Sequence, residues 1–504
     1  MTAVLEKPVA SDERAEPGGP WAAVAALTVF ETRRLLTRLP LIVAFLVFIG
    51  WTVWRSGRDG DGFPALQDVD RATQSAPMLV GLAVLLCVNR AVLRSRRHGT
   101  EHHFAVLLLQ PWRRTVAHAL SVVAAALLTA LCVAAQFGRE ALRPGAIGHG
   151  SVSELLVGPL TVLLFGMIGL LMAGLVRSAL AAPLLVVFLL FLFLFFSGMS
   201  YGGSRWLLPV VVDATPNTLP SDLLGRPAAW HALYLAGLAL CVGLVAVLAA
   251  GGRKPAVLAG VAGALAMTLV GGVAQAGGDS PELVRARERA SADPEVQSCV
   301  RRDGATYCVF PEWGPRVGDW AGVVDRVRSL AGGGAQDQKI VVRQQIEARY
   351  GLTSDSALTP LERPHEVTVG TAWGGNRVPE FSAAVAGVLV AGNEKASTSM
   401  CDGRIVTVMW LALGWESDPM AALRRVRLDD SDTGSALVLQ PTDGLSMNAA
   451  QTEVLRELLA RPRGEVTARV KSHWAELTAP KVTAARAAEL LGVAAPEEED
   501  KCSG

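Results

Sequence analysis

Long runs of uncharged, apolar residues fill the first 276 positions of the chain. A helix that crosses a bilayer needs about 20 predominantly apolar residues, and the two longest runs, 155–196 and 228–276, are each long enough for two crossings. Arg177 and Pro183 divide the first of these runs, and the polar residues at 251–255 divide the second. The pattern therefore predicts seven spans, which lie at 39–54, 76–89, 115–135, two within 155–196, and two within 228–276.

The segment before the first span, residues 21–38, combines apolar and charged side chains at helical spacing. It is too polar to cross a bilayer, so we expect an amphipathic helix that lies in the membrane interface. The alternative is a continuation of the first span, which Pro40 and three arginines disfavour. The apolar members are Leu27, Phe30, Leu35 and Leu36, and the charged members are Glu31, Arg33, Arg34 and Arg38.

Between the second and third spans the chain reads RSRRHGTEHHFAVLLLQPWRR, from Arg94 to Arg114. Its apolar centre, residues 104–109, is too short to cross a bilayer and is bounded by arginines on both sides. We expect a short interfacial helix that ends at Pro111, with the third span beginning after Arg114.

Lys and Arg residues are distributed unevenly over the segments between the spans. Fourteen of them lie on the side that carries the N-terminus, against seven on the other side. Because positively charged loops tend to stay in the cytoplasm, we expect a cytoplasmic N-terminus with a disordered tail at 1–20. Seven spans of a multi-pass protein of the cell membrane then place a domain at 277–495 and an acidic tail at 496–504 outside the cytoplasm.

Composition divides the chain at the same point. Overall 51% of the residues are hydrophobic and 18% are charged, which is too apolar for an ordinary soluble protein. The net charge of +1 conceals a basic part, residues 1–276 with 21 Lys and Arg against 14 Asp and Glu, and an acidic remainder with 26 against 32. The remainder has no basic stripe with interleaved aromatic residues, so nucleic acid is not expected as a partner.

Residues 277–495 are predicted to form an α+β domain that is large enough for its own core. Apolar stripes near the end predict three helices, the last of which stops at Gly492. Five tryptophans either line a binding groove or fill the core, which is the commoner role; they are Trp313, Trp320, Trp373, Trp410 and Trp415. Short β-branched runs predict strands at 339–343, 366–371, 387–391, 405–409 and 436–440.

Four of the seven cysteines lie in the predicted external domain. Cys299 and Cys308 flank an Asp-Gly turn, an arrangement that suits a disulfide across a hairpin and requires an oxidising compartment. A zinc site is the alternative, but the sequence lacks the paired CxxC spacing of such sites. Cys401 and Cys502 remain as a possible second pair.

Several kinds of site have no counterpart in the sequence. The stretch AGNEKAST, residues 391–398, lacks the spacing of a phosphate-binding Walker A loop. His365 and Glu366 are not followed by the second histidine of a helical zinc pair, and no G-x-S-x-G elbow occurs. No charged residue lies within a predicted span apart from Arg177, which argues against transport driven by protons or ions. We therefore expect no catalytic residue, metal or cofactor in this chain.

The order of elements over about residues 20–252 resembles the type-2 ABC exporter permeases, with an interfacial helix, two spans joined by a cytosolic helical loop, and four further spans. In that family the loop often contains Gly-Thr, an acidic residue, an apolar stretch, and Pro followed by Arg. The resemblance implies that a separate ABC ATPase, which binds ATP and Mg²⁺, acts on this loop and on the helix that carries Glu31, Arg33 and Arg34. The loop residues are Gly99, Thr100, Glu101, Phe104, Leu107, Pro111, Arg113 and Arg114, although basic residues precede Gly-Thr here and the Pro comes later than usual.

A second resemblance concerns residues 204–224, which Pro209, Pro216 and Pro220 interrupt. In the same family this outer segment forms short re-entrant helices that cap the translocation path; an ordinary outer loop is the alternative. The last span, 255–276, is an addition to the six-span core at 39–252, and the domain after it resembles external domains of some actinobacterial ABC permeases. The expected fold is thus a membrane all-α, six-helix permease core, a seventh transmembrane helix and an α+β extracytoplasmic domain.

These features together indicate the permease subunit of an ATP-driven exporter. Its expected partners are an ABC ATPase, a second copy or a related permease, and membrane lipids. The alternative is a multi-span receptor or sensor whose external domain binds a ligand without transport. A membrane-tethered enzyme is a third possibility, which seven spans and the missing catalytic motifs disfavour.

Overall fold

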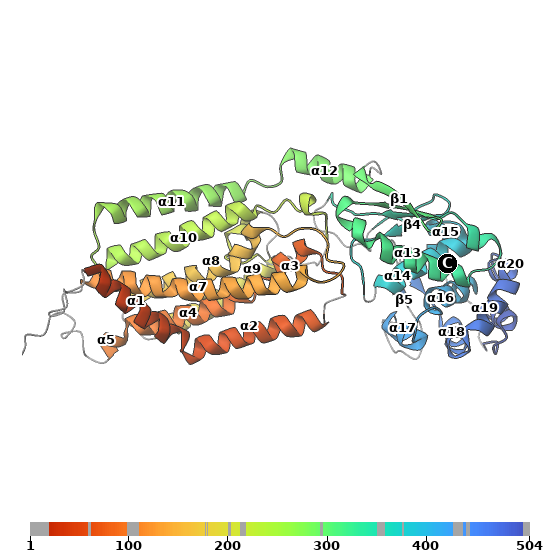
Figure 1. The fold of residues 1–504 in the computed structure, drawn as a ribbon, viewed down its shortest axis with the longest axis horizontal. Coiled ribbons are helices and arrows are strands. Elements are labelled where there is room, and N and C mark those ends of the chain that lie inside the picture. The colour runs from red at the N-terminus through yellow and green to blue at the C-terminus, as the bar shows by residue number, and fades with distance from the viewer. Residues whose placement is uncertain are drawn as a thin grey trace, which may run out of the picture.

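The computed structural model describes residues 20–58, 62–97, 110–176, 178, 180–199, 203–211, 218–292, 296–349, 358–374, 377–426, 437–439 and 444–496. Figure 1 shows an elongated molecule with a bundle of long helices on one side and a domain of short helices and strands on the other. The helices of the bundle are α1 (Pro20–Leu36), α2 (Leu39–Arg58), α3 (Leu66–Ala72), α4 (Pro77–Val92), α5 (Arg94–Arg97), α7 (Pro111–Ala141), α8 (Val152–Leu175), α9 (Ala181–Met199), η1 (Gly203–Leu207), η2 (Ser221–Leu223), α10 (Ala228–Ala249) and α11 (Pro255–Gln275).

The bundle is that of a membrane protein. Within the described ranges, six helical segments are long and apolar enough to cross a bilayer: Leu39–Ser56, Leu66–Val92, Pro111–Ala141, Val152–Leu175, Ala228–Ala249 and Pro255–Gln275. The segment predicted as the fifth span is α9, an almost entirely apolar helix. Its stretch Ala181–Phe195 is shorter than the other six candidate spans. The sequence therefore located all of these apolar helices, with boundaries that differ by a few residues.

The long helices run side by side, and their connections gather at two opposite ends (Figure 1). The end that carries α1, α5 and the turn at 250–254 is called the basal end below. The opposite end, called the domain end, carries α3, the 142–151 loop, η2 and the chain that leads into the C-terminal domain. The described chain thus begins at the basal end and finishes in the C-terminal domain, beyond the opposite end of the bundle.

Two boundaries at the basal end bear on the predictions. α1 ends at Leu36, and a break at Thr37 and Arg38 separates it from α2; the predicted place of this helix in the membrane interface stays a prediction. Pro111 begins α7, and Arg113 and Arg114 lie inside α7, whereas the predicted interfacial helix at 104–109 lies outside the described residues. Proline suits the first position of a helix because its missing N–H would have no intrahelical partner there. The prediction that the third span starts after Arg114 was therefore wrong by one helical turn.

Glycines allow the bundle helices to approach closely. A Cβ on Gly169 of α8 would lie 2.5 Å from the carbonyl oxygen of Leu85 in α4, and one on Gly271 of α11 would lie 2.6 Å from the backbone nitrogen of Tyr234 in α10. Side chains at these positions would push the backbones apart, so only glycine permits this spacing. The α4–α8 and α10–α11 pairs are consequently packed backbone against backbone.

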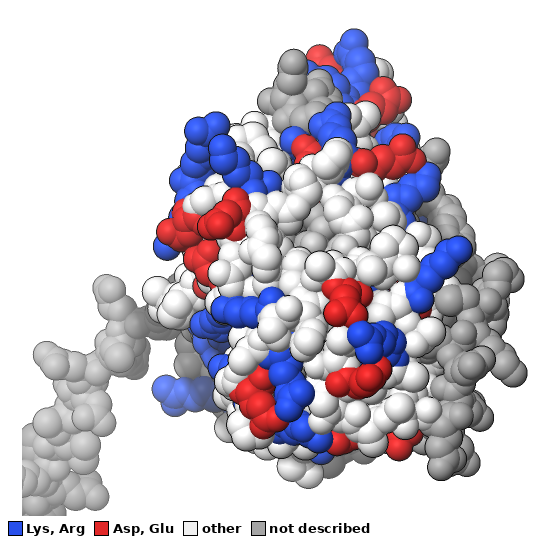
Figure 2. Space-filling view, turned by 90° about the vertical axis from the view of Figure 1, so that its right-hand side faces the viewer, with Lys and Arg blue, Asp and Glu red and all other residues white. Residues whose placement is uncertain are grey.

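The C-terminal domain is built around a four-stranded sheet of order β1-β2-β3-β4. β1 and β2 form an antiparallel hairpin, whereas β2, β3 and β4 run parallel. Figure 2 shows side chains of both charge signs intermixed on the face of this domain that points away from the bundle. The elements are α12 (Pro281–Ala292), β1 (Ser298–Arg302), β2 (Ala305–Val309), η4 (Pro311–Arg316), α13 (Val317–Leu330), η5 (Gly333–Asp337), β3 (Val341–Gln344), β4 (Glu366–Val369), α14 (Arg377–Ala391), α15 (Glu394–Thr398), α16 (Arg404–Leu413), α17 (Pro419–Val426), β5 (Leu437–Leu439), β6 (Gly444–Ser446), α18 (Ala449–Ala460), α19 (Arg463–Ser472), α20 (Trp474–Leu477) and α21 (Ala484–Leu491).

Two of the predicted strands are helical. Residues 387–391 belong to α14 and residues 405–409 belong to α16, whereas β3, β4 and β5 match the other predicted runs. Every residue of α16 from Ile405 to Leu413 is buried. A helix that is buried on all sides has no polar face, so its apolar run cannot be told from that of a buried strand.

The tryptophans of this domain are core residues. Trp313 and Trp320 are fully buried, and Trp373 and Trp410 are exposed by only 3% and 1%. Trp373 meets Trp320 and Phe381 edge-on, with ring centroids 6.1 and 5.7 Å apart. These four side chains therefore fill the interior and do not line a groove. The predicted stop of the last helix is confirmed, because Gly492 closes α21 in the left-handed conformation.

Glu394 is a buried carboxyl whose ionisation opposes folding. It opens α15 and accepts hydrogen bonds from the backbone N–H groups of Leu361 (2.9 Å) and Thr368 (2.5 Å) and from the Thr368 hydroxyl (2.8 Å). Burial outweighs these donors and raises the pKa of Glu394 above its ordinary value of 4.5, with a contribution from the charge of Glu366. The folded state therefore binds the proton more tightly than the unfolded chain does.

We expect the stability of the full chain, relative to that of a Glu394→Gln variant, to fall as the pH rises above about 4.5 toward the raised pKa. In this window the folded state carries more protons at the site than the unfolded state, so the free energy of unfolding decreases with pH. Denaturant titrations in detergent from about pH 4 to about pH 8 measure the difference. The control is Glu362→Gln at an exposed carboxyl whose pKa Lys395 lowers, where the dependence should have the opposite sign. Parallel profiles for wild type and Glu394→Gln would contradict the expectation.

Candidate functional site at the basal end

Trp112 joins three segments at the basal end. It lies in the first turn of α7, is 8% exposed, and donates a hydrogen bond from Nε1 to Oε1 of Gln110 (2.6 Å). The ring of Trp21 in α1 meets it edge-on at a centroid distance of 6.1 Å. The ammonium of Lys254, from the turn between α10 and α11, lies 4.8 Å from the ring centroid, which is cation–π distance. A movement of α1 or of this turn therefore acts directly on α7.

An ion pair connects α1 to α5. The carboxylate of Glu31 accepts a hydrogen bond from Nη2 of Arg94 at 2.6 Å, and the two side chains are only 6% and 24% exposed. Beside this pair, the ring of His118 and the hydroxyl of Ser121 from α7 are buried, and the hydroxyl donates to the His118 carbonyl oxygen (2.7 Å). Partly buried, charged hydrogen bonds of this kind hold geometry more firmly than exposed ones.

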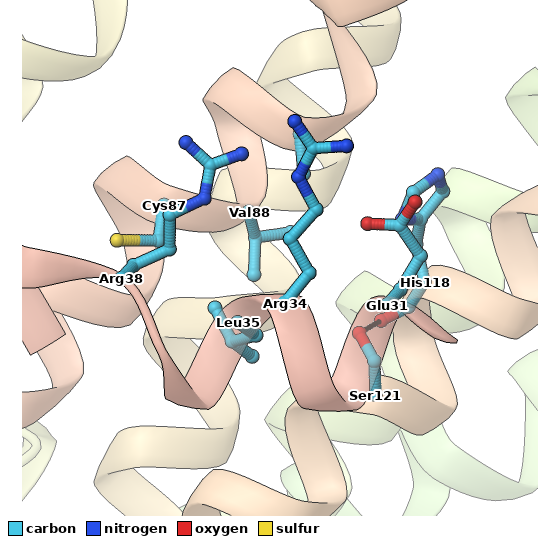
Figure 3. A pocket seen from close by; sticks show the side chains of 9 residues that line it. Glu31, Arg34, Leu35, Arg38, Cys87, Val88, His118 and Ser121 are labelled. Atoms are coloured by element: carbon cyan, nitrogen blue, oxygen red, sulfur yellow. Dashed lines mark hydrogen bonds between the residues drawn. The ribbon is translucent and has the colours of Figure 1, made fainter. Parts of the chain in front are cut away.

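Figure 3 shows that Glu31, His118 and Ser121 line a small pocket between α1, α4 and α7. Glu31 lies next to His118, while Arg34 of α1 and Arg38, which follows α1, lie on the same side of the pocket, with Cys87 of α4 beside Arg38. The pocket thus has one neutralised carboxylate and two arginines.

The predicted coupling residues are only partly within the described structure. Gly99, Thr100, Glu101, Phe104 and Leu107 lie outside the described residues. The other three, Pro111, Arg113 and Arg114, form the first turn of α7, next to Trp112. In α1, Glu31 is buried against α5, whereas Arg33 and Arg34 are exposed. The structure therefore brings the described part of the loop and the interfacial helix into contact.

Sequence reasoning missed the residues that make this contact. Trp112, Arg94 and His118 were treated as loop or span residues without a partner. A tryptophan between a proline and two arginines at a predicted membrane boundary was the available signal, since such rings favour the interface. Nothing in the sequence identified Arg94 as the partner of Glu31, because the two are 63 positions apart.

The C-terminal domain is joined to the domain end by polar contacts. Both carboxylate oxygens of Glu312 accept the backbone N–H of Ser221, at 3.0 and 3.2 Å, and one also accepts the amide of Gln67 at 3.3 Å. Arg316 donates to the Phe63 carbonyl oxygen at 2.5 Å, and Arg287 donates to the carbonyl oxygens of residues 223 and 224 at 2.8 and 2.9 Å. These hydrogen bonds attach the C-terminal domain to the connecting segments at the domain end of the bundle.

A buried ion pair lies at the same end. Glu154 is in the first turn of α8, and its oxygens accept Nε of Arg226 at 2.7 Å and Nη2 at 3.3 Å, with both side chains at most 6% exposed. The amide of Gln74 also donates to Glu154. The sequence placed Glu154 just outside a span, but α8 begins at Val152, so the prediction of uncharged spans was wrong here. Buried Asp70 and Glu140 lie in the neighbouring helical segments.

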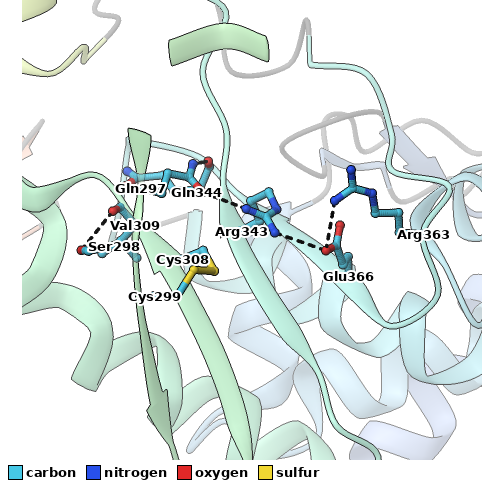
Figure 4. Close-up of a disulfide and its surroundings, with 9 residues drawn as sticks. All are labelled: Gln297, Ser298, Cys299, Cys308, Val309, Arg343, Gln344, Arg363 and Glu366. Carbon is cyan, nitrogen blue, oxygen red and sulfur yellow. Dashed lines mark hydrogen bonds and ion pairs between the residues drawn. A yellow bond between two sulfur atoms is a disulfide. The ribbon is translucent and has the colours of Figure 1, made fainter. Parts of the chain in front are cut away.

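The predicted hairpin disulfide is present (Figure 4). Cys299 and Cys308 face each other across the β1–β2 ladder and are bonded with a Cα–Cα distance of 4.0 Å. Cys401 is also disulfide-bonded, while Cys502 lies outside the described residues, so its pairing with Cys401 stays a prediction. Cys87, Cys132 and Cys241 are free thiols in the bundle, as the sequence indicated.

The described side chains form two sets of contacts, one at each end of the bundle. Among these residues, no group of three or more His, Cys, Asp or Glu side chains is arranged to hold a metal ion. The basal contacts instead couple α1, α5 and α7, and the domain-end contacts couple the bundle to the C-terminal domain. No protein-family model, curated protein or solved structure matches the chain.

Proposed function

We propose that this chain is the permease subunit of an ATP-driven ABC exporter, acted on at its basal end by a separate ATPase. The observation that carries the proposal is the position of α1, which is separate from the spans, packs against α7, and is tied to both flanks of the 94–114 loop. Through Glu31 it meets Arg94 before the loop, and through Trp21 it meets Trp112 after it.

Such an arrangement can transmit force. A partner that pushes on the loop moves α5 and the first turn of α7 together, because α1 connects them. The same turn of α7 contacts Lys254, so the motion also reaches the connection between α10 and α11. Rigid helices held by such contacts are the usual carriers of rearrangement between distant sites.

The proposed orientation has the basal end in the cytoplasm and the C-terminal domain outside it. Its support is the excess of Lys and Arg at the basal connections and the Cys299–Cys308 disulfide, since such bonds persist in oxidising compartments. In this orientation the domain end faces the exit of the path. Within the segment that was expected to cap that path, the backbone of η2 is hydrogen-bonded to Glu312 and Arg287.

The exporter proposal is tested by co-expression and co-purification of the full chain with candidate ABC ATPases that carry Walker motifs. A Glu101→Arg variant, with a charge reversal in the loop, should lose most of the bound ATPase while its spans stay folded. The control is Glu288→Arg, an equal charge reversal at an exposed position of α12 at the other end of the molecule. If the ATPase binds Glu101→Arg and wild type alike, with an unchanged hydrolysis rate, the 94–114 loop does not couple the two proteins. That result would favour a receptor without transport.

A further inference from the structure

Three arginines at the basal end pair with no Asp or Glu among the described residues. Arg34 and Arg38 line the pocket between α1, α4 and α7, and Arg90 lies in the last turn of α4. Arg90 follows Cys87, which also lines the pocket, by three residues, so the two lie on the same face of α4. Within the part of the chain that the structure describes, no Asp or Glu pairs with any of these three arginines.

The one carboxylate in the pocket is already neutralised. Glu31 is paired with Arg94 at 2.6 Å and is only 6% exposed. The pocket therefore keeps an excess of positive charge, supplied by Arg34 and Arg38 among its lining residues (Figure 3). Guanidinium groups bind phosphate oxygens through paired, charged hydrogen bonds, which makes a phosphate the matching anion.

An apolar surface begins directly beside these arginines. α2 starts one residue after Arg38, and its side chains Leu39, Ile42 and Leu46 are 72%, 41% and 64% exposed. In a membrane protein such a face lies against acyl chains. A basic pocket beside an exposed apolar helix face is complementary to the two parts of a phospholipid. The arginines suit its phosphate, and the apolar face suits its hydrocarbon chains.

We propose that Arg34, Arg38 and Arg90 bind the phosphate of an anionic phospholipid whose acyl chains lie along α2. The preference for an anionic lipid follows from the pairing of Glu31, because a zwitterionic headgroup would bring its ammonium group among arginines with no carboxylate left to accept it. Basic pockets between helices at the cytoplasmic edge of a membrane recognise headgroups in this way. The site requires only that the basal end meets a membrane leaflet, and it does not depend on an ATPase.

The test is lipid retention by the purified full-length protein, measured by native mass spectrometry in detergent with added phosphatidylglycerol or phosphatidylcholine. Wild type should bind phosphatidylglycerol about tenfold more tightly than an Arg34→Ala/Arg38→Ala variant, since two charged hydrogen-bond donors are lost. Phosphatidylcholine should bind both proteins weakly and equally. The matched control is Arg33→Ala, which removes an exposed arginine of the same helix that does not line the pocket, and it should retain wild-type affinity.

Three results would overturn the proposal. Equal losses in Arg33→Ala and the double variant would show a general effect of surface charge. Equal affinity of wild type for the two lipids would remove the selectivity for anionic headgroups. Displacement of phosphatidylglycerol by inorganic phosphate at similar concentration would assign the arginines to a free anion. Circular dichroism and thermal unfolding of each variant separate these outcomes from a loss of α1, and an Arg34→Lys/Arg38→Lys variant, which keeps the charge, should recover only part of the binding.

Discussion

Replacing Arg226 with methionine should destabilise the bundle by about 3–5 kcal/mol. The change leaves the carboxylate of Glu154 buried, with the amide of Gln74 as its remaining described partner. A buried charge without a counter-charge has lost its hydration and gains nothing in return. This loss accounts for most of the free energy that breaking a buried ion pair costs. Denaturant titration of the full chain in mixed micelles measures the free energy of unfolding.

Two further variants identify the cause of the loss. A double variant, Arg226→Met with Glu154→Leu, should recover a large part of the stability, because neither charge is then buried alone. Arg139→Met removes an exposed arginine of α7 near the same end and should change the stability by less than about 0.5 kcal/mol. A double variant as unstable as Arg226→Met would point to lost packing against Trp206, whose ring lies 4.9 Å from the Arg226 guanidinium carbon.

Truncation of Trp112 to alanine should weaken the attachment of α1 and of the 250–254 turn to α7. Removal of a buried aromatic side chain from a packed site costs about 3–5 kcal/mol, and here the ring also contacts Trp21 and Lys254. We expect faster hydrogen exchange of the α1 amides, with little change in α8, because α8 is held by its own contacts with α4 and α10.

The control for Trp112 is Trp230→Ala. Trp230 is in α10, is 46% exposed, and lies at the domain end. Its truncation should leave exchange in α1 unchanged. Protection of α1 that survives in Trp112→Ala would mean that the Glu31–Arg94 ion pair alone holds the helix. The prediction that Trp112 attaches α1 to α7 would then be wrong.

The sequence predicted those parts of the fold that depend on local pattern. Apolar runs of bilayer length located the bundle helices, because hydrocarbon requires such runs whatever the tertiary packing. The alternation of charges before Pro40 identified α1, and the Asp-Gly turn between Cys299 and Cys308 identified a bonded hairpin. In each case the determining interaction is between neighbours in the sequence or between the chain and its solvent.

Features that depend on distant partners could not be predicted. The runs at 387–391 and 405–409 are β-branched, but burial on all sides allows them to be helical in α14 and α16. Glu154 fell just outside the predicted fourth span, and nothing local paired it with its counter-charge, Arg226, which is 72 positions away. The Trp112 contacts were missed for the same reason, since Trp21 and Lys254 lie on opposite sides of it in the sequence.

The contacts between the bundle and the C-terminal domain also bear on how the chain is made. Gln67 and Glu312 are separated by 245 positions, and Phe63 and Arg316 by 253. During synthesis the connection between α2 and α4 therefore emerges long before the residues that contact it. Its polar groups stay without those partners until all later helices have been inserted. Contacts of such long range form last and expose incomplete surfaces in the meantime. Docking of the domain is thus the step that completes assembly, so a chain interrupted after α11 would have an unfinished end that quality-control proteases can reach.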